Sequence, residues 1–313
     1  MIQYFVALLG FSMMLQAAIY STDISPFGVD KNYMGIEILD QKKVNLAHID
    51  GYKFREISDL AYNKNKNILY MVSDEGIVFK FKATFGTKIG KLQPQKAIKL
   101  VKKNGKEFRS YRKDSEGATL DRYNRLILSF EGRPKIARFG EDGRLKSRYK
   151  VPYKISKIRF LRHKNKGMEA LAYHKRYGLI VATEYPIKKD NKKIQTLYSA
   201  SSHEWKFKAA AAKNSAVTAL EVMDDGNILV LERAYSGLLS PLVITLKKVF
   251  INQKCHKKRL CKDEVLATFD NSKGWSVDNF EGLAKVGKDR YIIVSDDGDN
   301  FYQDTILFYF RVK

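Results

Sequence analysis

The sequence predicts an all-β protein, most simply a β-propeller of five four-stranded blades. One hairpin pattern occurs five times along the chain, with starts at Ser58, Glu116, Glu169, Thr218 and Glu281. Two further short apolar runs follow most copies, which gives four strands per repeat. No long amphipathic helix interrupts the series, and a period of about fifty residues is typical of propeller blades.

Each copy is a short apolar strand, a polar turn with Asn, Gly or Asp, and a second strand rich in Ile, Leu and Val, as in an antiparallel hairpin. The five copies are SDLAYNKNKNILYMVSDE (58–75), EGATLDRYNRLILSFEG (116–132), EALAYHKRYGLIVATE (169–184), TALEVMDDGNILVLER (218–233) and EGLAKVGKDRYIIVSDD (281–297). The third runs are IVFKF, KIARF, TLYSA, PLVITL and TILFYFRV. A fourth run is visible as KAIKLV, LKSRYKV, HEWKFKA and EVLATF, whereas the last copy reaches the C-terminus without one.

A segment near the start of the chain can supply the missing strand. GIEILD (35–40) has no hairpin of its own, and its pairing with the last blade closes the ring and hides the edges of the sheets. A sixth blade between residues 83 and 115 is the main alternative. A β-sandwich or two unrelated β domains are the other architectures that the pattern allows.

The first residues predict an exported protein. An uncharged run from Phe5 to Ala18 has about the length of the apolar part of a signal peptide and is short for a membrane span. We therefore expect a signal peptide over residues 1–18, one propeller domain over residues 19–313, and a periplasmic or secreted location without a transmembrane span in the mature chain. Because no Lys or Arg precedes the run, an uncleaved anchor or a buried N-terminal strand stays an alternative.

The chain has two cysteines, Cys255 and Cys261, with five residues between them. In an oxidising compartment this spacing can close a local disulfide, and the sequence leaves open whether it does. Only His256 lies nearby, which is too few ligands for a zinc site.

The net charge is +23, from 57 Lys and Arg against 34 Asp and Glu, and the lysines lie in loops rather than in one basic helix. No nucleic-acid-binding module is present, and the sequence has no HExxH, GxSxG, dinucleotide or P-loop motif. The basic residues form either a solvated exterior or a surface for an anionic partner such as an envelope component. We expect a monomer.

Acidic residues bracket the repeated hairpins. A hairpin brings the start of its first strand beside the end of its second, so both positions lie at one mouth of the channel that a propeller encloses. Three copies open with Glu, at Glu116, Glu169 and Glu281, whereas Ser58 and Thr218 stand at the same position in the other two. The predicted mouth carries eight carboxylates: Asp74, Glu116, Glu131, Glu169, Glu184, Glu232, Glu281 and Asp296.

Carboxylates this close raise one another's pKa and destabilise the fold unless something compensates their charge. A hard cation such as Ca²⁺ prefers oxygen ligands, Arg133 and Arg233 can pair with the acids, or some acids stay protonated. In the alternative interpretation the acids cap loops and bind backbone amides of the next blade, and are structural.

Four segments carry a family resemblance: GMEALAYHKRYGLIVATEYP, DSEGATLDRYNRLILSFEGR, ALEVMDDGNILVLERAYSG and NFEGLAKVGKDRYIIVSDDGDNFYQDTILFYF. Together and in order, they resemble the phytase-like, or "esterase-like activity of phytase", family of exported bacterial propellers, from about Asp50 to the C-terminus. The resemblance implies a periplasmic or secreted propeller with phosphoester-hydrolysing activity at its repeated Glu and Asp residues. Ser58 and Thr218 depart from the pattern.

The leading prediction is a metal-assisted hydrolase of phosphoesters, acting on a phosphorylated small molecule. The expected site has Ca²⁺ ligands (Glu116, Glu169, Glu281 and Glu232), phosphate-binding arginines (Arg133 and Arg233) and a general base among three acids (Glu131, Glu184 and Asp296). The rival is a non-catalytic propeller that binds a ligand or an envelope partner and uses its repeated acids as structural groups.

Overall fold

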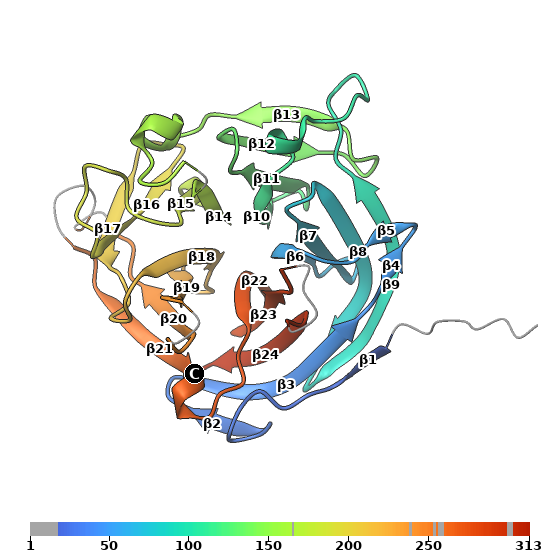
Figure 1. Cartoon of the computed structure of the whole chain (residues 1–313), viewed down its shortest axis with the longest axis vertical. Coiled ribbons are helices and arrows are strands. Elements are labelled where there is room, and N and C mark those ends of the chain that lie inside the picture. The colour runs from blue at the N-terminus through green and yellow to red at the C-terminus, as the bar shows by residue number, and fades with distance from the viewer. Residues whose placement is uncertain (1–17, 165, 238–239, 253–254, 256–259, 299–302) are drawn as a thin grey trace, which may run out of the picture.

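The computed structural model describes residues 18–313 except 165, 238–239, 253–254, 256–259 and 299–302. Its main strands form five antiparallel sheets arranged as blades around a central axis (Figure 1). The only helices among the described residues are four three-residue 3₁₀ turns: η1 (Ser110–Arg112), η2 (Tyr153–Ile155), η3 (Ile158–Phe160) and η4 (Asn271–Lys273). The predicted five-bladed, all-β architecture is confirmed.

Four blades are built from consecutive strands that run from the axis outward. Blade 1 contains β6 (Ile57–Asn63), β7 (Ile68–Ser73), β8 (Ile77–Phe85) and β9 (Ile89–Lys99). Blade 2 contains β10 (Ser115–Leu120), β11 (Leu126–Phe130), β12 (Lys135–Phe139) and β13 (Leu145–Tyr149). Blade 3 contains β14 (Met168–His174), β15 (Gly178–Thr183), β16 (Ile194–Ser199) and β17 (Glu204–Lys208). Blade 4 contains β18 (Ser215–Val222), β19 (Ile228–Ala234), β20 (Val243–Val249) and β21 (Asp263–Asp270).

Blade 5 joins segments from the two ends of the chain, as predicted for GIEILD. It contains β22 (Asn279–Gly287), β23 (Arg290–Asp296), β24 (Ile306–Val312) and β3 (Ile36–Asn45). β3 pairs antiparallel with β24, and β1 (Ala18–Ser21) and β2 (Lys31–Tyr33) pair with β3 at the outside of the ring (Figure 1). A short hairpin of β4 (His48–Ile49) and β5 (Tyr52–Lys53) leads into blade 1.

The predicted alternative of a sixth blade does not hold. Residues 83–115 contain the end of β8, all of β9 and the turn η1, before β10 opens blade 2. The strand β9 completes blade 1, so this segment is the outer part of one blade and the connection to the next.

The core is divided into five clusters of buried side chains, one between each pair of neighbouring blades. Leu60 and Met71 of blade 1 share a cluster with Ile292 and Leu307 of blade 5, for example. Both faces of each sheet are therefore covered. This explains why second strands such as ILVL in β19 read as unbroken apolar runs rather than as alternating ones.

Cys255 and Cys261 form a disulfide, which settles the pairing that their spacing left open. Both cysteines are buried in the cluster between blades 3 and 4, with Trp205 among their neighbours. The bridge closes a loop of blade 4 between β20 and β21.

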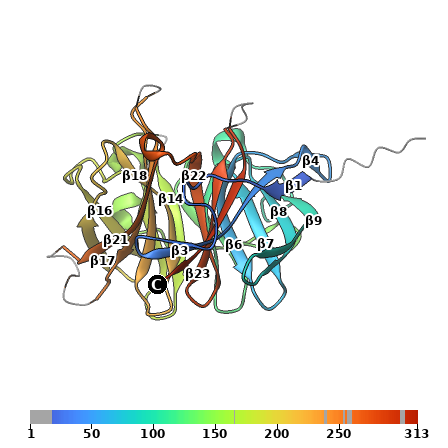
Figure 2. The same cartoon turned by 90° about the horizontal axis from the view of Figure 1, so that it is seen from below.

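Most of the predicted signal peptide, residues 1–18, lies outside the described residues, and the first described ones form β1. Within the part of the chain that the structure describes, no helix has the length and apolar character of a membrane span. Seen edge-on, the inner strands run between loops at the two ends of the axis (Figure 2).

Candidate active site

The inner strands of all five blades carry a β-bulge at the same place. The register with the second strand shifts between Ile57 and Asp59, Ser115 and Ala118, Met168 and Ala170, Val217 and Ala219, and Phe280 and Gly282. The residues left out of the ladder thus include the five opening positions of the repeat: Ser58, Glu116, Glu169, Thr218 and Glu281. A bulge re-aims the side chain that it frees, so these positions can serve a site at the end of the axis.

Two of the bulges require glycine directly after the acid. A β carbon on Gly117 would lie 2.8 Å from the carbonyl oxygen of Glu169, and one on Gly282 would lie 2.8 Å from Cα of Asp59. Neighbouring inner strands therefore approach too closely for a side chain here. This contact is the physical reason for the Glu-Gly pairs in blades 2 and 5.

The second strands end at the same rim. Asp74, Glu131 and Glu184 directly follow β7, β11 and β15, and Asp296 ends β23. In blade 4 the pairing of Val217 with Glu232 matches that of Met168 with Thr183 in blade 3. The residue equivalent to Glu184 is therefore Arg233.

The sequence analysis assigned the rim position of blade 4 to Glu232, and the pairing of the strands places that position one residue later. Arg233, fifteen residues after Thr218, occupies the rim position that was assigned to Glu232. The side chain of Glu232 is fully buried, with Lys247 Nζ 3.0 Å away. Its other oxygen accepts from the backbone N–H of Ala210 at 2.9 Å, so Glu232 links blades 3 and 4.

Two groups of three carboxylates lie at the rim and share Glu131. Asp114, Glu116 and Glu131 form one, and Glu131, Glu169 and Glu184 form the other; within each, one oxygen per residue lies within 4.8 Å of the others. Both groups could hold a metal ion. We call these five residues the carboxylate cluster.

Sequence reasoning missed Asp114. A comparison of the residues two positions before the openings of the repeats could have identified it. These are Glu56 in blade 1, Asp114 in blade 2 and Asn279 in blade 5. Polar residues recur at this place in three of the five copies.

Burial and mutual repulsion disfavour charge in the cluster. Burial raises the pKa of Glu131 to about 8, and the charges of Asp114 and Glu184 act in the same direction. The pKa values of Glu116 and Glu169 lie well above the usual range, first through burial and then through the neighbouring carboxylates. Without a compensating cation, the cluster therefore retains protons at neutral pH.

Two cations reach the rim. Lys166, in the loop before β14, lies with Nζ 2.9 Å from the Glu184 carboxylate. Arg233 donates to Glu281 at 2.5 Å and lies 3.5 Å from Glu184, and it also donates to Asn279. By contrast, Oε2 of Glu169 is buried without a hydrogen-bond partner among the described residues.

Blades 1 and 5 add three further acids to the rim: Asp74, Glu281 and Asp296. Burial raises the pKa of Asp74 and of Asp296 to about 8, helped by Glu56 at Asp74 and by Glu281 at Asp296. Asn279 donates to both Glu281 and Asp296, at 3.0 and 3.2 Å. The acidic rim thus holds eight carboxylates: Asp74, Asp114, Glu116, Glu131, Glu169, Glu184, Glu281 and Asp296.

Beneath the rim, Asp59 has a structural role. Its buried carboxylate accepts the backbone N–H groups of Leu60, Ala118 and Leu283 at 2.7–2.9 Å, from blades 1, 2 and 5. Such a fully hydrogen-bonded carboxylate holds neighbouring blades together and has little capacity left for a ligand.

Arg133, the second predicted phosphate-binding residue, lies apart from Arg233. Its side chain is exposed and lines a cavity of about 330 Å³ in blade 2. Lys102, Arg112, Lys135 and Arg148 also line this cavity. The structure therefore places Arg233 at the acidic rim and Arg133 in a basic pocket that is lined in part by residues of η1 and β12.

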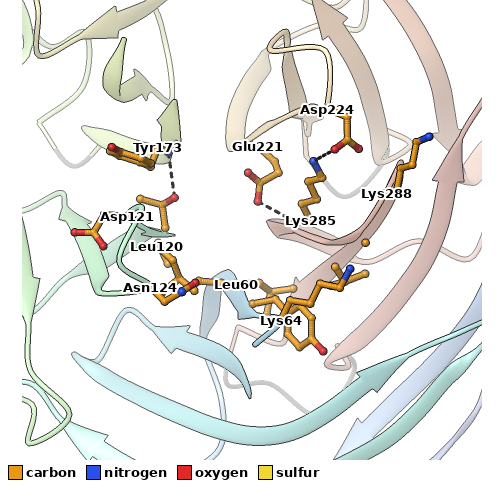
Figure 3. Close-up of a pocket in the computed structure, with 16 residues that line it drawn as sticks. Leu60, Lys64, Leu120, Asp121, Asn124, Tyr173, Glu221, Asp224, Lys285 and Lys288 are labelled. Carbon is orange, nitrogen blue, oxygen red and sulfur yellow. Dashed lines mark hydrogen bonds and ion pairs between the residues drawn. The ribbon is translucent and has the colours of Figure 1, made fainter. Parts of the chain in front are cut away.

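The opposite end of the axis also has a cavity, of about 450 Å³, lined by the late residues of all five inner strands (Figure 3). Its charges are largely matched with one another. Lys285 donates to Asp224 at 2.5 Å, and Glu221 accepts the backbone N–H groups of Val222 and Lys285. Of the two ends of the axis, the acidic rim has the excess of carboxylates among the described residues, and it is therefore the candidate active site.

Comparisons with known proteins agree with the fold. A family model described as Phytase-like, esterase-like activity of phytase, matches residues 52–301. No curated protein matches the sequence.

Three of the solved structures that match the chain are the following. The PQQ-bound aldose sugar dehydrogenase of Streptomyces coelicolor is 10% identical, covers 95% of this chain and 99% of its own, and has a TM-score of 0.43. Virginiamycin B lyase of Staphylococcus aureus is 9% identical with the same coverage and a TM-score of 0.39. The Cps50 (Swd1) propeller domain of Myceliophteria thermophila is 10% identical, covers 88% of this chain and 91% of its own, and has a TM-score of 0.40. Similarity at this level carries no argument about function.

Proposed function

Because the chain belongs to the Phytase-like family, we propose that it is a metal-assisted phosphoester hydrolase whose active site is the acidic rim. The observation that carries this proposal is the pair of carboxylate groups that share Glu131, next to the unpartnered oxygen of Glu169. We further propose that the protein acts in the periplasm or outside the cell, which the disulfide supports.

The carboxylate cluster fits a hard divalent cation such as Ca²⁺. Calcium takes six to eight oxygen ligands and tolerates irregular geometry. Asp114, Glu116, Glu131, Glu169 and Glu184 would hold it, and Oε2 of Glu169 would gain the partner that it lacks in the protein alone. When bound, the cation would polarise a phosphoryl oxygen and lower the pKa of a water molecule.

Arg233 and Lys166 supply the positive charge that holds the phosphate group. Arg233 is fixed by Glu281 and Asn279, so its guanidinium is oriented before a substrate arrives. A planar guanidinium can bind two phosphate oxygens at once, whereas the ammonium of Lys166 acts as a point charge. In this proposal Glu281 positions Arg233 rather than ligating the metal.

Asp296 is the best placed of the three predicted general bases. Glu131 and Glu184 belong to the carboxylate cluster, whereas Asp296 lies outside it, beside Asn279. The pKa of Asp296 is raised to about 8. A general base is most efficient when its pKa lies near the pH at which the enzyme works, so this value suits a reaction near neutral pH. Asp296 takes a proton from the attacking water, whose oxygen bonds to phosphorus as the phosphorus–oxygen ester bond breaks. The departing oxygen takes a proton from solvent and leaves as the alcohol.

The proposal is tested by assaying the purified protein on phosphomonoesters and phosphodiesters with Ca²⁺ and with a chelator. We expect hydrolysis that requires the metal and that falls at least about 100-fold in Asp296→Asn and in Glu169→Gln. No hydrolysis of any ester with either addition would overturn the proposal.

A non-catalytic propeller is the second candidate, and one observation favours it. Glu131 accepts the backbone N–H of Gly167 at 2.6 Å, which links blades 2 and 3 in the way that Asp59 links its neighbours. If the acids only join blades, Glu131→Gln lowers stability by the same amount with and without Ca²⁺.

A further inference from the structure

A cavity of about 870 Å³ lies in the loop layer at the same end as the acidic rim. Its walls come from the loop before β14, the loop between β15 and β16, and the connection from β17 to β18. The first two segments adjoin β14 and β15, which position Glu169 and Glu184 of the carboxylate cluster, and the third leads into β18 of the next blade. The cavity therefore lies beside the site on the side of blades 3 and 4.

The floor of this cavity is apolar. Four consecutive alanines, residues 209–212, connect β17 to β18 and line it together with Tyr185, Pro186 and Ile194. None of these side chains carries a charge at neutral pH, and Ala211 is exposed. An apolar floor on a chain with a net charge of +23 is an unusual surface, and it favours an apolar group of a ligand.

The other side chains that line the cavity are mainly cationic. Arg162, His163, Lys192, Lys193, Lys208 and Lys213 line it, and no carboxylate does so among the described residues. The guanidinium of Arg162 donates to the carbonyls of Pro186, Ile187 and Asp190, so it fixes the loop between β15 and β16. The lysines supply a positive potential that attracts a ligand of negative charge.

Tyr185 connects the cavity with the carboxylate cluster. It directly follows Glu184 of the cluster, and its ring packs against His163 with 5.3 Å between the ring centroids. Lys166, which contacts Glu184, belongs to the same loop as Arg162 and His163. A ligand in the cavity would therefore lie next to residues that adjoin the carboxylate cluster.

We propose that this cavity binds the apolar alcohol portion of the substrate, so that the preferred substrates are phosphate esters of aryl or alkyl alcohols. The inference rests on the proposed function, because it takes the acidic rim as the place where the phosphate group binds. The cationic side chains that line the cavity attract the anionic ester, and the apolar side chains bind its alcohol portion.

Binding tests this assignment without requiring turnover. The affinities of naphthylphosphonate and methylphosphonate are measured by calorimetry in Ca²⁺, for the full chain and for two variants. Ala211→Glu places a charge on the apolar floor. Asn65→Glu adds the same charge at an exposed turn between β6 and β7, at the other end of the axis, and is the matched control.

We expect the wild-type protein and Asn65→Glu to bind naphthylphosphonate at least about tenfold more tightly than methylphosphonate. In Ala211→Glu this preference falls to about twofold or less, while the affinity for methylphosphonate stays within about twofold of wild type. Equal affinities for the two phosphonates in the wild-type protein, or a preference that Ala211→Glu retains, would overturn the assignment.

Hydrolysis separates this inference from the proposed function. Metal-dependent hydrolysis with the same kcat/KM for naphthyl phosphate and glycerol phosphate contradicts the cavity assignment and leaves the hydrolase proposal intact. A naphthyl preference in binding that Ala211→Glu abolishes, without hydrolysis of any ester, supports the cavity assignment and contradicts the hydrolase proposal.

Discussion

At the end of β19, neighbouring side chains serve different parts of the molecule. Arg233 contacts Glu281 and Glu184 at the acidic rim, whereas Glu232 contacts Lys247 and Ala210 between blades 3 and 4. The alternation of side chains along a strand separates these roles. If the repeats are aligned one residue out of register, Glu232, which forms a structural ion pair, is mistaken for Arg233, which belongs to the candidate site.

This placement predicts the behaviour of Lys247→Met. The variant leaves the buried carboxylate of Glu232 and the partly exposed carboxylate of Asp263 without their cation, and Lys247 Nζ also donates to the carbonyl of Lys208 at 2.6 Å. Breaking a buried ion pair in this way costs about 3–5 kcal/mol of folding free energy. Urea unfolding should show this loss both in chelator and in Ca²⁺, with an unchanged stabilisation by the metal. Loss of the metal response in Lys247→Met would contradict the assignment of Glu232 to the fold.

The raised pKa values predict how stability depends on pH without metal. Asp74, Glu131 and Asp296 each have a pKa of about 8 in the folded protein and an ordinary value near 4 when unfolded. The folded state therefore holds more protons between these limits, so the free energy of unfolding falls as the pH rises from about 4 to about 8.

We expect the free energy of unfolding in chelator to be lower at pH 8 than at pH 5, by up to roughly 4 kcal/mol for each carboxyl whose pKa is raised in this way. Saturating Ca²⁺ should reduce this difference, because the cation favours the ionised carboxylates. Surface acids such as Asp142, whose pKa is lowered by backbone and Lys146 hydrogen bonds, lose their contribution only below about pH 4 and do not affect the comparison. Stability that rises from pH 5 to pH 8 in chelator would contradict the account of the rim.

At the scale of the strand, the repeated bulge is the element that builds the rim. It occurs in all five inner strands, including the two that carry Ser58 and Thr218 in place of an acid. The bulge is thus a property of the fold and does not depend on the acid. Blades 2, 3 and 5 have a glutamate at the bulged position. Glycine after the acid in blades 2 and 5 lets neighbouring inner strands approach.

Gly117→Ala tests this element. Its β carbon would lie 2.5 Å from Oγ of Ser129 and 2.8 Å from the backbone of blade 3, so the inner strands must separate. We expect a loss of about 2–3 kcal/mol in urea unfolding, together with a weaker stabilisation by Ca²⁺. Gly86→Ala is the control, because its nearest atom would lie 4.0 Å away. Equal stabilities for the two variants would show that the strands are not in close contact at Gly117.

The hairpins, the blade count and the closing strand could be predicted from the sequence, because local apolar runs and turn residues determine each of them. Sequence reasoning also identified Glu116, Glu131, Glu169 and Glu184 as neighbours, since the repeat places them at equivalent ends of strands. It missed Asp114 and Lys166, which lie just before the inner strands, where loops differ between blades. It also misplaced Glu232, because a register depends on pairing across the sheet that turn length alone does not determine.

At the scale of the whole molecule, the ring is closed by hydrogen bonds between distant parts of the chain. β3 pairs with β24 along seven pairs of residues, and Arg311 contacts Glu37 across this joint at 2.9 Å. The closure covers the edge of β24, which would otherwise be open to another chain. It also keeps blades 1 and 5 together, which the acidic rim requires.

Two truncated chains test the closure. A chain that starts at residue 47 lacks β1–β3 and exposes the edge of β24, so we expect oligomers or precipitation in size-exclusion chromatography with light scattering. A chain that starts at residue 22 lacks β1 and the residues before it, keeps β3 in blade 5, and should have the same oligomeric state as the full chain. A well-behaved monomer from the shorter chain would contradict the importance of the closing strand.

The central claim is that the acidic rim binds a divalent cation, and melting temperatures with and without Ca²⁺ test it most directly. At a Ca²⁺ concentration of about 100 times Kd, binding adds about 2.7 kcal/mol, which raises the Tm of the wild-type protein by several degrees. Glu169→Gln removes a ligand and relieves repulsion, so its Tm should be unchanged or higher in chelator and should not rise with Ca²⁺. Glu264→Gln, at an exposed position of β21, is the control and should respond as the wild type does. No rise in the wild-type protein, or a full rise in Glu169→Gln, would contradict the claim.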